Sequence, residues 1–543
     1  MNDTRPGWSR PSTLVLAATT AAALALLVPR VRFVPLWDGG FYAECVLTAV
    51  ENGLRPYWLR CVGHPSQAYV ILAGVARWLA PNGTLSFFVV DSLLFAAACV
   101  GFYRVMRLAL PSRELDAERA QATGAFMLQP SFLAAVLQPN IDLPVLAGFV
   151  WCLVTLVERR WLWTVLVGLA MVFSKETGVL LYGLTCACYA VWLVARDHGP
   201  WRERARAVVR MAPLAIPLVA FAAYVVAYAV LRPTAAPMWE GYSRKSTIAE
   251  QFIIPHFDAF TVSYLAMIFV LNFAWIPSLA IAADFLAALR ARFSGHARSA
   301  AGLDRGTVTL LAIVTAAVAY FLTRYATFTN ARYVLAAVAM LLAMFVIALV
   351  RLGLPPPVRR GLLAAYTVLL VVSSVRTIDP ISRRVFGTFP VGSHEMLSMS
   401  SITKECCGPF GRDQLAYSLE FTVFDGLLDS ALLATGGDVD SLTIVLPDEG
   451  DWYVVGLIDR ASRRRTLDHR NARRPWTMMA TDASSDQLRT PANAWYFALP
   501  NHDFAGGLRK LEARYEIGPE RRVERRGYAM SIYPLVLKQS RKP

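Results

Sequence analysis

Acidic residues stand directly beside an apolar stretch near the start of the chain. Residues 13 to 34 are apolar over a length that can cross a membrane, and Asp38, Glu44 and Glu51 follow in "WDGGFYAECVLTAVENG". A carboxylate at the edge of a bilayer is costly unless it faces water or a partner. Asp38 could act as a general base on an acceptor from the aqueous side, while a lipid-borne donor approaches from the membrane. The alternative is a solvated loop acid.

Cationic residues at the ends of later apolar blocks could bind phosphate. Lys175 and Glu176 form the turn "SKETG", and Arg332 and Tyr333 open a later block, with Arg324 shortly before them. Lysine as a compact charge and arginine as a planar fork both suit a lipid-linked phosphate. Interfacial anchoring is the alternative, with the lysine snorkelling and the Arg–Tyr pair holding a helix end at the membrane boundary.

Other polar residues have competing structural interpretations. Asp142 opens an apolar block in "IDLP", where helix capping and the helix dipole account for an acid, and a substrate-facing role is the alternative. Cys45 and Cys61 share the first predicted outer loop and either form a disulfide or remain two independent thiols.

A divalent metal site is one further hypothesis. Its candidate ligands, which could instead contact the acceptor, are Glu250, His256 and Asp258. Their spacing is irregular and the histidine stands alone, so the pattern favours no particular metal. No other cofactor is predicted.

The composition shows what must position these residues. The chain has 543 residues, of which 56% are hydrophobic and 17% charged, and its mean hydropathy is +0.42. The apolar residues fall in blocks of about 16–25, the length of a membrane-spanning helix. The net charge of +15 comes from arginines clustered between these blocks, as the positive-inside rule expects, which argues against a nucleic-acid role. The first block lacks a convincing cleavage site and is interpreted as a retained anchor.

Connections between the apolar blocks alternate in arginine content. The Arg-rich connections are 104–119, 159–160, 195–210, 290–305 and 351–360, and the Arg-poor ones are 137–144, 174–178, 232–258 and 324–333. This alternation predicts about eleven spans in an inner (cytoplasmic) membrane, with the N-terminus inside and the C-terminus outside. Residues 66–80 form a short apolar stretch that carries Arg77, so we expect a helix along the outer interface.

Two domains are predicted. Residues 1–376 form the polytopic α-helical membrane domain, whose first outer loop spans 35–90, and residues 377–543 form a soluble periplasmic or extracellular domain. In the second domain, β-like runs at 441–447, 451–458 and 494–500 combine with a helical pattern at 414–435. Strands alternating with helices predict a small α/β fold.

Four segments, in order, resemble the GT-C fold glycosyltransferases. They are the first span with Asp38 and "YAECVLTAVENG", "LQPNIDLPVLAGFVWCLVTL" (137–156), "GLAMVFSKETGVLLYG" (168–183) and "NARYVLAAVAM" (330–340). The nearest branch comprises the aminoarabinose transferases and protein O-mannosyltransferases, which use polyprenyl-phosphate sugars. The resemblance covers residues 1–376 and implies a GT-C-like membrane domain; a C-terminal outer domain also occurs in this family.

The resemblance also implies roles for individual residues. Asp38 corresponds to the family's catalytic acid, which would deprotonate or orient an acceptor hydroxyl that displaces polyprenyl phosphate with inversion. Donor-phosphate contacts would come from Lys175, Arg332, Tyr333 and Arg324, and acceptor or loop support from Glu44, His64, Glu176 and Asp142. Two features depart from the family pattern: Gly39 follows Asp38 where many relatives have a second acid, and "GHPSQ" has one proline after His64 where relatives commonly have two.

These patterns favour a membrane glycosyltransferase that delivers a sugar to an extracytoplasmic lipid, glycan or protein. Protein O-glycosylation is the alternative within that class. A lipid or polysaccharide flippase is a second class, but the chain shows no similar halves and few central charges of the kind a midplane transport site needs. A scaffold whose outer domain binds a partner is a third.

Overall fold

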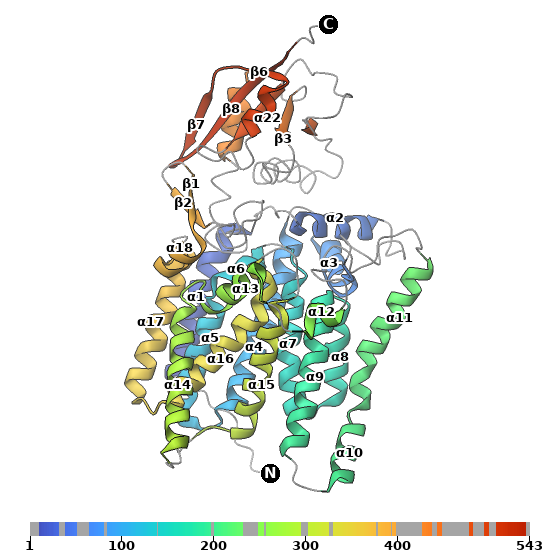
Figure 1. Cartoon of the computed structure of the whole chain (residues 1–543), viewed down its shortest axis with the longest axis vertical. Coiled ribbons are helices and arrows are strands. Elements are labelled where there is room, and N and C mark those ends of the chain that lie inside the picture. Colours follow the sequence, from blue (N-terminus) through green and yellow to red (C-terminus); the bar gives the residue numbers. More distant parts are fainter. Residues whose placement is uncertain are drawn as a thin grey trace.

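Helices make up the regular structure as far as Phe386, and strands dominate after it (Figure 1). The computed structural model describes residues 10–31, 38–51, 64–80, 84–137, 139–196, 200–231, 248–254, 257–294, 302–324, 330–375, 378–391, 394–397, 426–436, 442–447, 477–481, 494–498 and 507–538. All statements below concern these residues.

The helices of the first half run from α1 to α11. They are α1 (Arg10–Leu27), η1 (Val28–Arg30), α2 (Asp38–Glu51), α3 (Gln67–Leu79), α4 (Leu85–Ala109), η3 (Arg113–Leu115), α5 (Asp116–Met127), α6 (Pro130–Leu137), α7 (Asp142–Val157), α8 (Trp161–Val172), α9 (Glu176–Arg196), α10 (Trp201–Val209), η4 (Ala212–Ala215) and α11 (Ile216–Leu231).

The remaining helices and the strands complete the chain. They are α12 (Ile248–Phe252), α13 (Ala259–Phe269), α14 (Trp275–Phe293), α15 (Arg305–Leu322), η5 (Ala331–Val334), α16 (Leu335–Arg351), α17 (Pro356–Val375), α18 (Pro380–Phe386), β1 (Thr388–Val391), β2 (His394–Leu397), β3 (Thr443–Pro447), β4 (Thr477–Thr481), β5 (Ala494–Ala498), α22 (Gly507–Glu512), β6 (Tyr515–Ile517), β7 (Arg521–Arg525) and β8 (Tyr528–Leu537).

Several helices are long and apolar enough to cross a bilayer. In the described part of the chain there are six, or up to seven if the bent pair Arg113–Met127 and Pro130–Leu137, with 51° between its halves, is one broken span. Shorter apolar helices such as α7 and α8 stand among them. The protein is therefore a multi-pass membrane protein, and the count of eleven spans stays a prediction.

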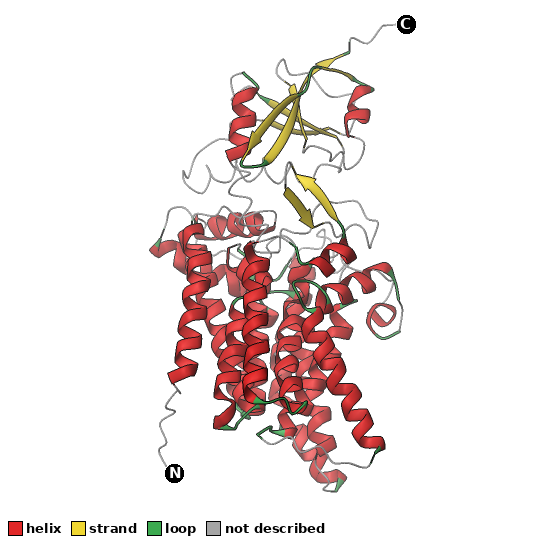
Figure 2. Ribbon diagram, turned by 90° about the vertical axis from the view of Figure 1, so that its left-hand side faces the viewer, coloured by secondary structure: helices red, strands yellow, loops and turns green. Residues whose placement is uncertain are grey.

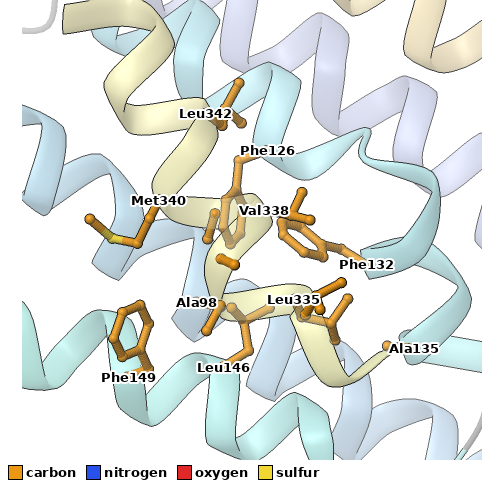
Figure 3. Packing of buried hydrophobic residues seen from close by; sticks show 14 of the residues in the cluster. Ala98, Phe126, Phe132, Ala135, Leu146, Phe149, Leu335, Val338, Met340 and Leu342 are labelled. Atoms are coloured by element: carbon orange, nitrogen blue, oxygen red, sulfur yellow. The ribbon is translucent and has the colours of Figure 1, made fainter. Parts of the chain in front are cut away.

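The centre of the bundle is α16, whose residues from Leu335 to Val350 are all buried. Figure 3 shows Leu335 and Val338 of this helix among Phe126 of α5, Phe132 of α6 and Leu146 of α7. A helix that is apolar on every face must be enclosed by others. The short segment η5, which leads into α16, is therefore held in a fixed place at one end of the bundle.

Two short helices, α2 and α3, lie at that same end (Figure 1). At about 1.5 Å per residue, the 13 residues of α3 span about 20 Å, too little to cross a hydrocarbon core of about 30 Å. Its buried face includes Tyr69 and Arg77, and its exposed face carries Leu72 and Trp78. This pattern agrees with the predicted interfacial helix. Helix α2 packs on α3 and ends at Glu51, as the following Asn-Gly pair predicts.

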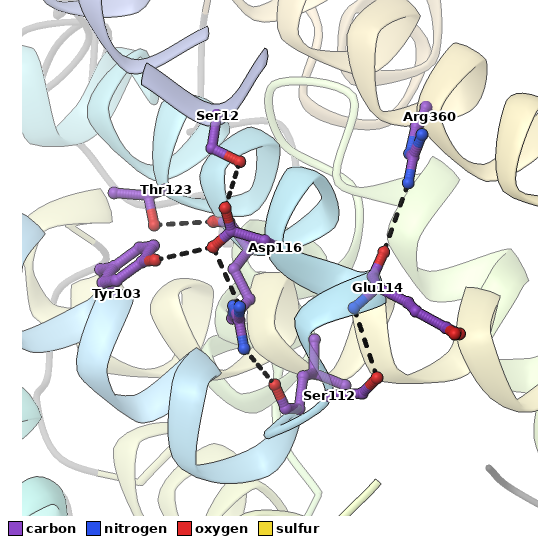
Figure 4. A network of polar contacts seen from close by, with 9 residues as sticks. Ser12, Tyr103, Ser112, Glu114, Asp116, Thr123 and Arg360 are labelled. Atoms are coloured by element: carbon purple, nitrogen blue, oxygen red, sulfur yellow. Dashed lines mark hydrogen bonds and ion pairs between the residues drawn. The ribbon is translucent and has the colours of Figure 1, made fainter. Parts of the chain in front are cut away.

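The opposite end of the bundle is basic. The start of α10, the end of α14 and the start of α17, which carry arginines, lie there (Figure 1). A polar network secures this end (Figure 4), with Ser12 and Tyr103 donating to Asp116 at 2.6 and 3.0 Å. Buried Glu118 lies 3.0 Å from the Arg359 guanidinium, which ties α5 to α17. Below, this is called the basic end, and the other the α2–α3 end.

The C-terminal part contains a mixed sheet beyond the α2–α3 end (Figure 2). Its strand order is β4-β3-β5-β8-β6, and β7 also pairs with β8. Strand β3 is parallel to β4 and β5, whereas β8 is antiparallel to its neighbours. The predicted strands at 441–447 and 494–500 are present as β3 and β5. Residues 451–458 lie outside the described residues, as does most of the predicted helix at 414–435, of which residues 426–434 are helical.

The predicted boundary at residue 376 falls just after α17, and the division there stays a prediction. Helix α18 follows it and packs on the helical bundle, because Asp379 caps α18 and also accepts from the backbone N–H of Phe273 at 3.2 Å. Phe386 at its end is buried in the same core. The hairpin of β1 and β2 then leads towards the sheet (Figure 2).

Candidate active site

Three helix termini meet at the α2–α3 end and position four of the predicted site residues. They are the start of α7 with Asp142, the turn between α8 and α9 with Lys175, and η5 with Arg332 and Tyr333. We call these four residues the Lys175 cluster. The termini begin in a similar way: Asn140 Oδ1 accepts from the Asp142 N–H at 2.7 Å, and Asn330 Oδ1 accepts from the Arg332 N–H at 3.2 Å.

The turn that carries Lys175 depends on a glycine. A Cβ added to Gly178 would lie 2.1 Å from the carbonyl oxygen of Met171, far inside van der Waals contact. The Gly178 N–H also donates to the Lys175 carbonyl at 2.8 Å. Glycine therefore lets the start of α9 lie against the end of α8, and this close approach directs Lys175 into the bundle.

The Lys175 cluster is a buried ionic group. Lys175 Nζ lies 2.7 Å from Asp142 Oδ1, and Arg332 Nε lies 3.6 Å from Asp142 Oδ2. The side chains of Lys175, Asp142 and Arg332 are 1%, 6% and 8% exposed. The Tyr333 ring joins them, with Lys175 Nζ 4.2 Å and Arg332 Cζ 5.3 Å from its centroid. Each cation contacts both a carboxylate and the face of an aromatic ring, which offsets part of its desolvation.

Two cations against one carboxylate give Lys175, Arg332 and Asp142 a net charge of +1. Burial lowers the pKa of the Lys175 ammonium below its usual range, and the Arg332 charge lowers it further, against the opposing effects of Asp142 and Glu176. The first turn of α7 places Asp142 where the helix dipole favours a negative charge. This arrangement can receive an anion at the membrane boundary.

A second polar pair continues from the Lys175 cluster. His64 Nδ1 lies 2.7 Å from Glu176 Oε2, and the two side chains are 5% and 11% exposed. The Tyr42 ring of α2 is tilted against the imidazole, with 6.3 Å between centroids. A carboxylate on Nδ1 fixes the proton of a neutral imidazole there, so Nε2 carries the acceptor lone pair. Glu176 follows Lys175 in sequence, so this pair connects α2 and the residues before α3 to the cluster.

Two sequence-based interpretations are corrected here. Asp142 does not cap α7, because the N-cap residue is Ile141, which has no side-chain cap, and the Asp142 carboxylate is held by Lys175 and Arg332. Lys175 does not snorkel to the interface, because its side chain is turned inward and only 1% exposed. Both predictions treated each helix end alone, whereas the interaction joins residues 33 positions apart.

The first outer loop is described in part. Asp38 is the first residue of α2, and its side chain lies outside the described part of the structure. Glu44 lies one to two turns further along α2 and is half-buried. Cys45 is disulfide-bonded, and the other cysteines among the described residues are free. Cys61 lies outside the described residues, so its pairing with Cys45 stays a prediction.

The remaining candidates lie on α12, at the start of α13 and just after α15. Arg324 Cζ is 3.9 Å from the centroid of the Tyr320 ring, and Gln251 of α12 donates to the Arg324 carbonyl. Asp258 caps α13 by accepting from the Thr261 N–H and hydroxyl, both at 2.8 Å. Glu250 is half-buried on α12. His256 lies outside the described residues, and within those residues no group of three or more His, Cys, Asp or Glu side chains could hold a metal ion.

Sequence reasoning missed three residues that contribute to this arrangement. Asn140 and Asn330 shape the two helix starts, and Tyr42 packs against His64. A signal for the asparagines was present, because each stands two residues before a charged member of the cluster, in "NID" and "NAR". Asparagine side chains accept from the backbone two residues on in this way.

The fold and the charged helix ends define a class of membrane protein with the GT-C-like fold, as the sequence resemblance predicts. The structure is similar to the crystal structure of ArnT from Cupriavidus metallidurans bound to undecaprenyl phosphate, with a TM-score of 0.50 and 15% sequence identity. That match covers 96% of this chain and 97% of the other. The apo crystal structure of the same protein gives a TM-score of 0.49 at 16% identity over 96% and 98% of the two chains. No protein-family model and no curated protein matches the sequence.

Proposed function

We propose that this protein is a membrane glycosyltransferase. It moves a sugar from a polyprenyl-phosphate donor to a lipid, glycan or protein acceptor at the α2–α3 end, which faces the periplasm or its equivalent. Residues 1–376 form the catalytic domain in the inner membrane, and residues 377–543 form the outer domain. The reaction inverts the anomeric configuration, and Asp38 is the catalytic base.

The Lys175 cluster carries this proposal. Lys175, Arg332 and Asp142 combine into a buried group of net charge +1 at the ends of three membrane helices, where a lipid-linked phosphate would arrive. The shared fold adds support, since one of the similar ArnT structures holds undecaprenyl phosphate. A transporter would instead need its polar groups near the bilayer midplane.

Each residue of the Lys175 cluster has a different role in donor binding. Arg332 is the more exposed cation, at 8% against 1% for Lys175, so Arg332 contacts the phosphate directly and Lys175 supplies positive charge behind it. Asp142 holds the two cations in place. Tyr333 covers their flank, and Arg324, in the turn after α15, contributes a further positive charge at the same end of the bundle.

Asp38 stands at the first position of α2, where the helix dipole favours the ionised carboxylate that a base requires. The acceptor hydroxyl gives its proton to Asp38 as its oxygen bonds to the anomeric carbon. The bond from that carbon to the phosphate oxygen breaks, and the phosphate leaves with the electron pair beside Arg332. Glu44 and the His64–Glu176 pair hold α2 and the first outer loop around the acceptor.

The first experiment compares wild type with Asp38→Asn in detergent. Transfer of label is measured from a panel of polyprenyl-phosphate sugars, with membrane extract as acceptor, and binding of polyprenyl phosphate is measured separately. Glu51→Gln is the matched control, because Glu51 ends the same helix and its side chain is exposed.

We expect Asp38→Asn to lose transfer by about 10²-fold or more while it retains donor binding, and Glu51→Gln to keep both. Equal transfer by wild type and Asp38→Asn would remove Asp38 from the chemistry. Absence of transfer from every donor, with donor binding retained, would favour the flippase or scaffold classes.

A further inference from the structure

A second charged site lies at the basic end of the bundle, opposite the Lys175 cluster. It is a pocket of about 560 Å³ between the ends of α4 and α9, the turn from α7 to α8 and the start of α15. These elements are far apart in sequence, so the pocket is formed by the tertiary fold. It is too distant from the α2–α3 end to take part in the proposed transfer reaction.

The lining of the pocket is strongly cationic. Its guanidinium groups belong to Arg104, Arg107, Arg159 and Arg196. Its two carboxylates belong to Glu158 and Asp304, so the lining has a net charge of +2. Within the described part of the chain, no carboxylate lies within ion-pair distance of Arg107 or Arg196, although Arg196 interacts electrostatically with Asp304.

Both acids are already engaged. Asp304 Oδ2 accepts from the Thr307 N–H at 2.7 Å and from its hydroxyl at 2.6 Å, which caps α15. Glu158 Oε2 lies 2.9 Å from Arg160 Nε, and its other oxygen lies 3.8 Å from Arg104. The carboxylates therefore serve helix ends and a neighbouring arginine, and they leave the pocket with excess positive charge.

Aromatic rings and a glycine orient the arginines. Arg104 Cζ lies 5.6 Å from the centroid of the Trp151 ring, and Arg196 Cζ lies 5.2 Å from that of Trp192. A Cβ on Gly306 would come within 2.8 Å of an Arg196 nitrogen, so the glycine leaves room for that guanidinium. Planar guanidinium groups fixed by stacking are suited to bidentate contacts with phosphate oxygens.

The backbone at Arg159 is unusual. Its φ is 57°, in the left-handed region that glycine normally occupies just after a helix end. An arginine at this position keeps a cationic side chain in the pocket at the expense of a less favourable backbone.

An apolar stripe on α4 leads to the pocket from the membrane. Val89, Leu93 and Val100 are exposed hydrophobic residues at 42%, 66% and 55%. Their spacing places them on one face of the helix, and the same face continues to Arg104 and Arg107. An acyl chain lying along this stripe would bring its headgroup to the guanidinium groups. A soluble phosphate compound would gain nothing from the stripe.

We propose that this pocket binds the headgroup of an anionic phospholipid, whose acyl chains lie along α4. Basic pockets between membrane helices recognise such headgroups. The net charge of +2 matches a headgroup with two phosphates, as in cardiolipin, better than one with a single phosphate. The site is separate from the donor site and serves attachment to the charged leaflet rather than catalysis.

Lipid binding to the full-length protein tests the proposal. The protein is reconstituted in phosphatidylethanolamine nanodiscs and titrated with cardiolipin, and lipid retained on the protein is measured by native mass spectrometry. The test variant is Arg104→Gln/Arg196→Gln. The control is Arg290→Gln/Arg292→Gln, which removes the same charge from exposed positions in the last turn of α14, outside the pocket.

At about 1 kcal/mol per cation, the test variant should bind cardiolipin about thirtyfold more weakly, and the control should match wild type. If both variants lose cardiolipin affinity equally, the effect comes from overall surface charge and the pocket assignment is wrong. If pyrophosphate binds wild type as tightly as cardiolipin does, and no lipid is retained on the protein, the ligand is not a lipid and the proposal is wrong. Thermal unfolding midpoints confirm that both variants are folded. None of these readouts depends on transferase activity.

Discussion

In the Lys175 cluster, we expect substitution of Asp142 to destabilise the protein more than substitution of Lys175. Asp142→Asn removes the carboxylate shared by two cations, one of them only 1% exposed, and leaves both positive charges buried together. Breaking a buried ion pair in this way costs about 3–5 kcal/mol. Lys175→Met is milder, because Asp142 keeps Arg332 at 3.6 Å and the methionine fills much of the lysine volume, so we expect about 1–3 kcal/mol.

The double variant Asp142→Asn/Lys175→Met should be more stable than Asp142→Asn alone. It removes one of the two buried cations together with the carboxylate, and replacement of a buried pair by groups of similar volume is often close to neutral. A coupling energy of about 1–3 kcal/mol is therefore expected from the double-mutant cycle.

Unfolding in mixed detergent micelles, followed by the fluorescence of the 14 tryptophans, measures the free energies of unfolding of wild type and the three variants. Arg324→Gln serves as the control, because Arg324 contacts Tyr320 and should not couple to either substitution. The reasoning fails if Lys175→Met is as destabilising as Asp142→Asn, or if the double variant is the least stable of the three.

Three further predictions concern the same end of the bundle. Gly178→Ala should cost about 1–3 kcal/mol, because its Cβ would lie 2.1 Å from a backbone carbonyl oxygen. Gly361→Ala, whose Cβ would have no atom of the described residues within 4 Å, should be neutral or slightly stabilising, and thermal unfolding midpoints compare the two variants. Glu176→Gln should lower stability by about 1–3 kcal/mol through its 2.7 Å contact with His64, and an unchanged midpoint would contradict that contact. Because the pKa of Lys175 is lowered in the folded protein, the unfolded chain binds the lysine proton more tightly. The contribution of Lys175 to the free energy of unfolding should therefore rise as the pH rises towards about 10.4, while donor binding falls as the lysine loses its charge. Lys175→Met should abolish both pH dependences when stability and donor binding are measured over a pH series.

Local patterns in the sequence predicted the helical elements well. The start of α7 at Asp142, the end of α2 at Glu51 and the shortness of α3 all follow from apolar block lengths and stop signals near each position, and the interfacial placement of α3 stays a prediction. The break between α5 and α6 was not predicted. The sequence did carry a signal for it, because α6 begins at Pro130 and a proline disfavours helical backbone at the residue before it, which is where the 51° bend lies.

The sheet was harder to predict for a related reason. Strand β8 is its longest strand and pairs with β5, β6 and β7, yet its sequence contains Pro534. Proline lacks the N–H that a ladder uses, so a run containing it is normally assigned to an edge or a loop. Here only tertiary pairing, with Pro534 opposite Trp495, reveals a central strand.

In the candidate site, too, the residue types could be predicted from the local sequence, but the contacts between distant segments could not. The types of Lys175, Arg332 and Asp142 indicated phosphate chemistry, but no spacing rule could indicate that one carboxylate is shared by two cations from different helix ends. That sharing changes the expected behaviour of each residue. Lys175, for which phosphate contact was predicted and interfacial anchoring was the alternative, is a buried charge whose pKa is set by burial and by Asp142 and Arg332.

The two ends of the bundle use their cations in different ways, and this difference bears on function. At the α2–α3 end, each cation of the Lys175 cluster contacts the same carboxylate, so a phosphate that arrives there competes with Asp142 and can be released after the reaction. At the basic end, the four arginines of the pocket outnumber its two carboxylates, so an anion bound there meets less competition from within the protein. Turnover requires the first arrangement and stable attachment requires the second.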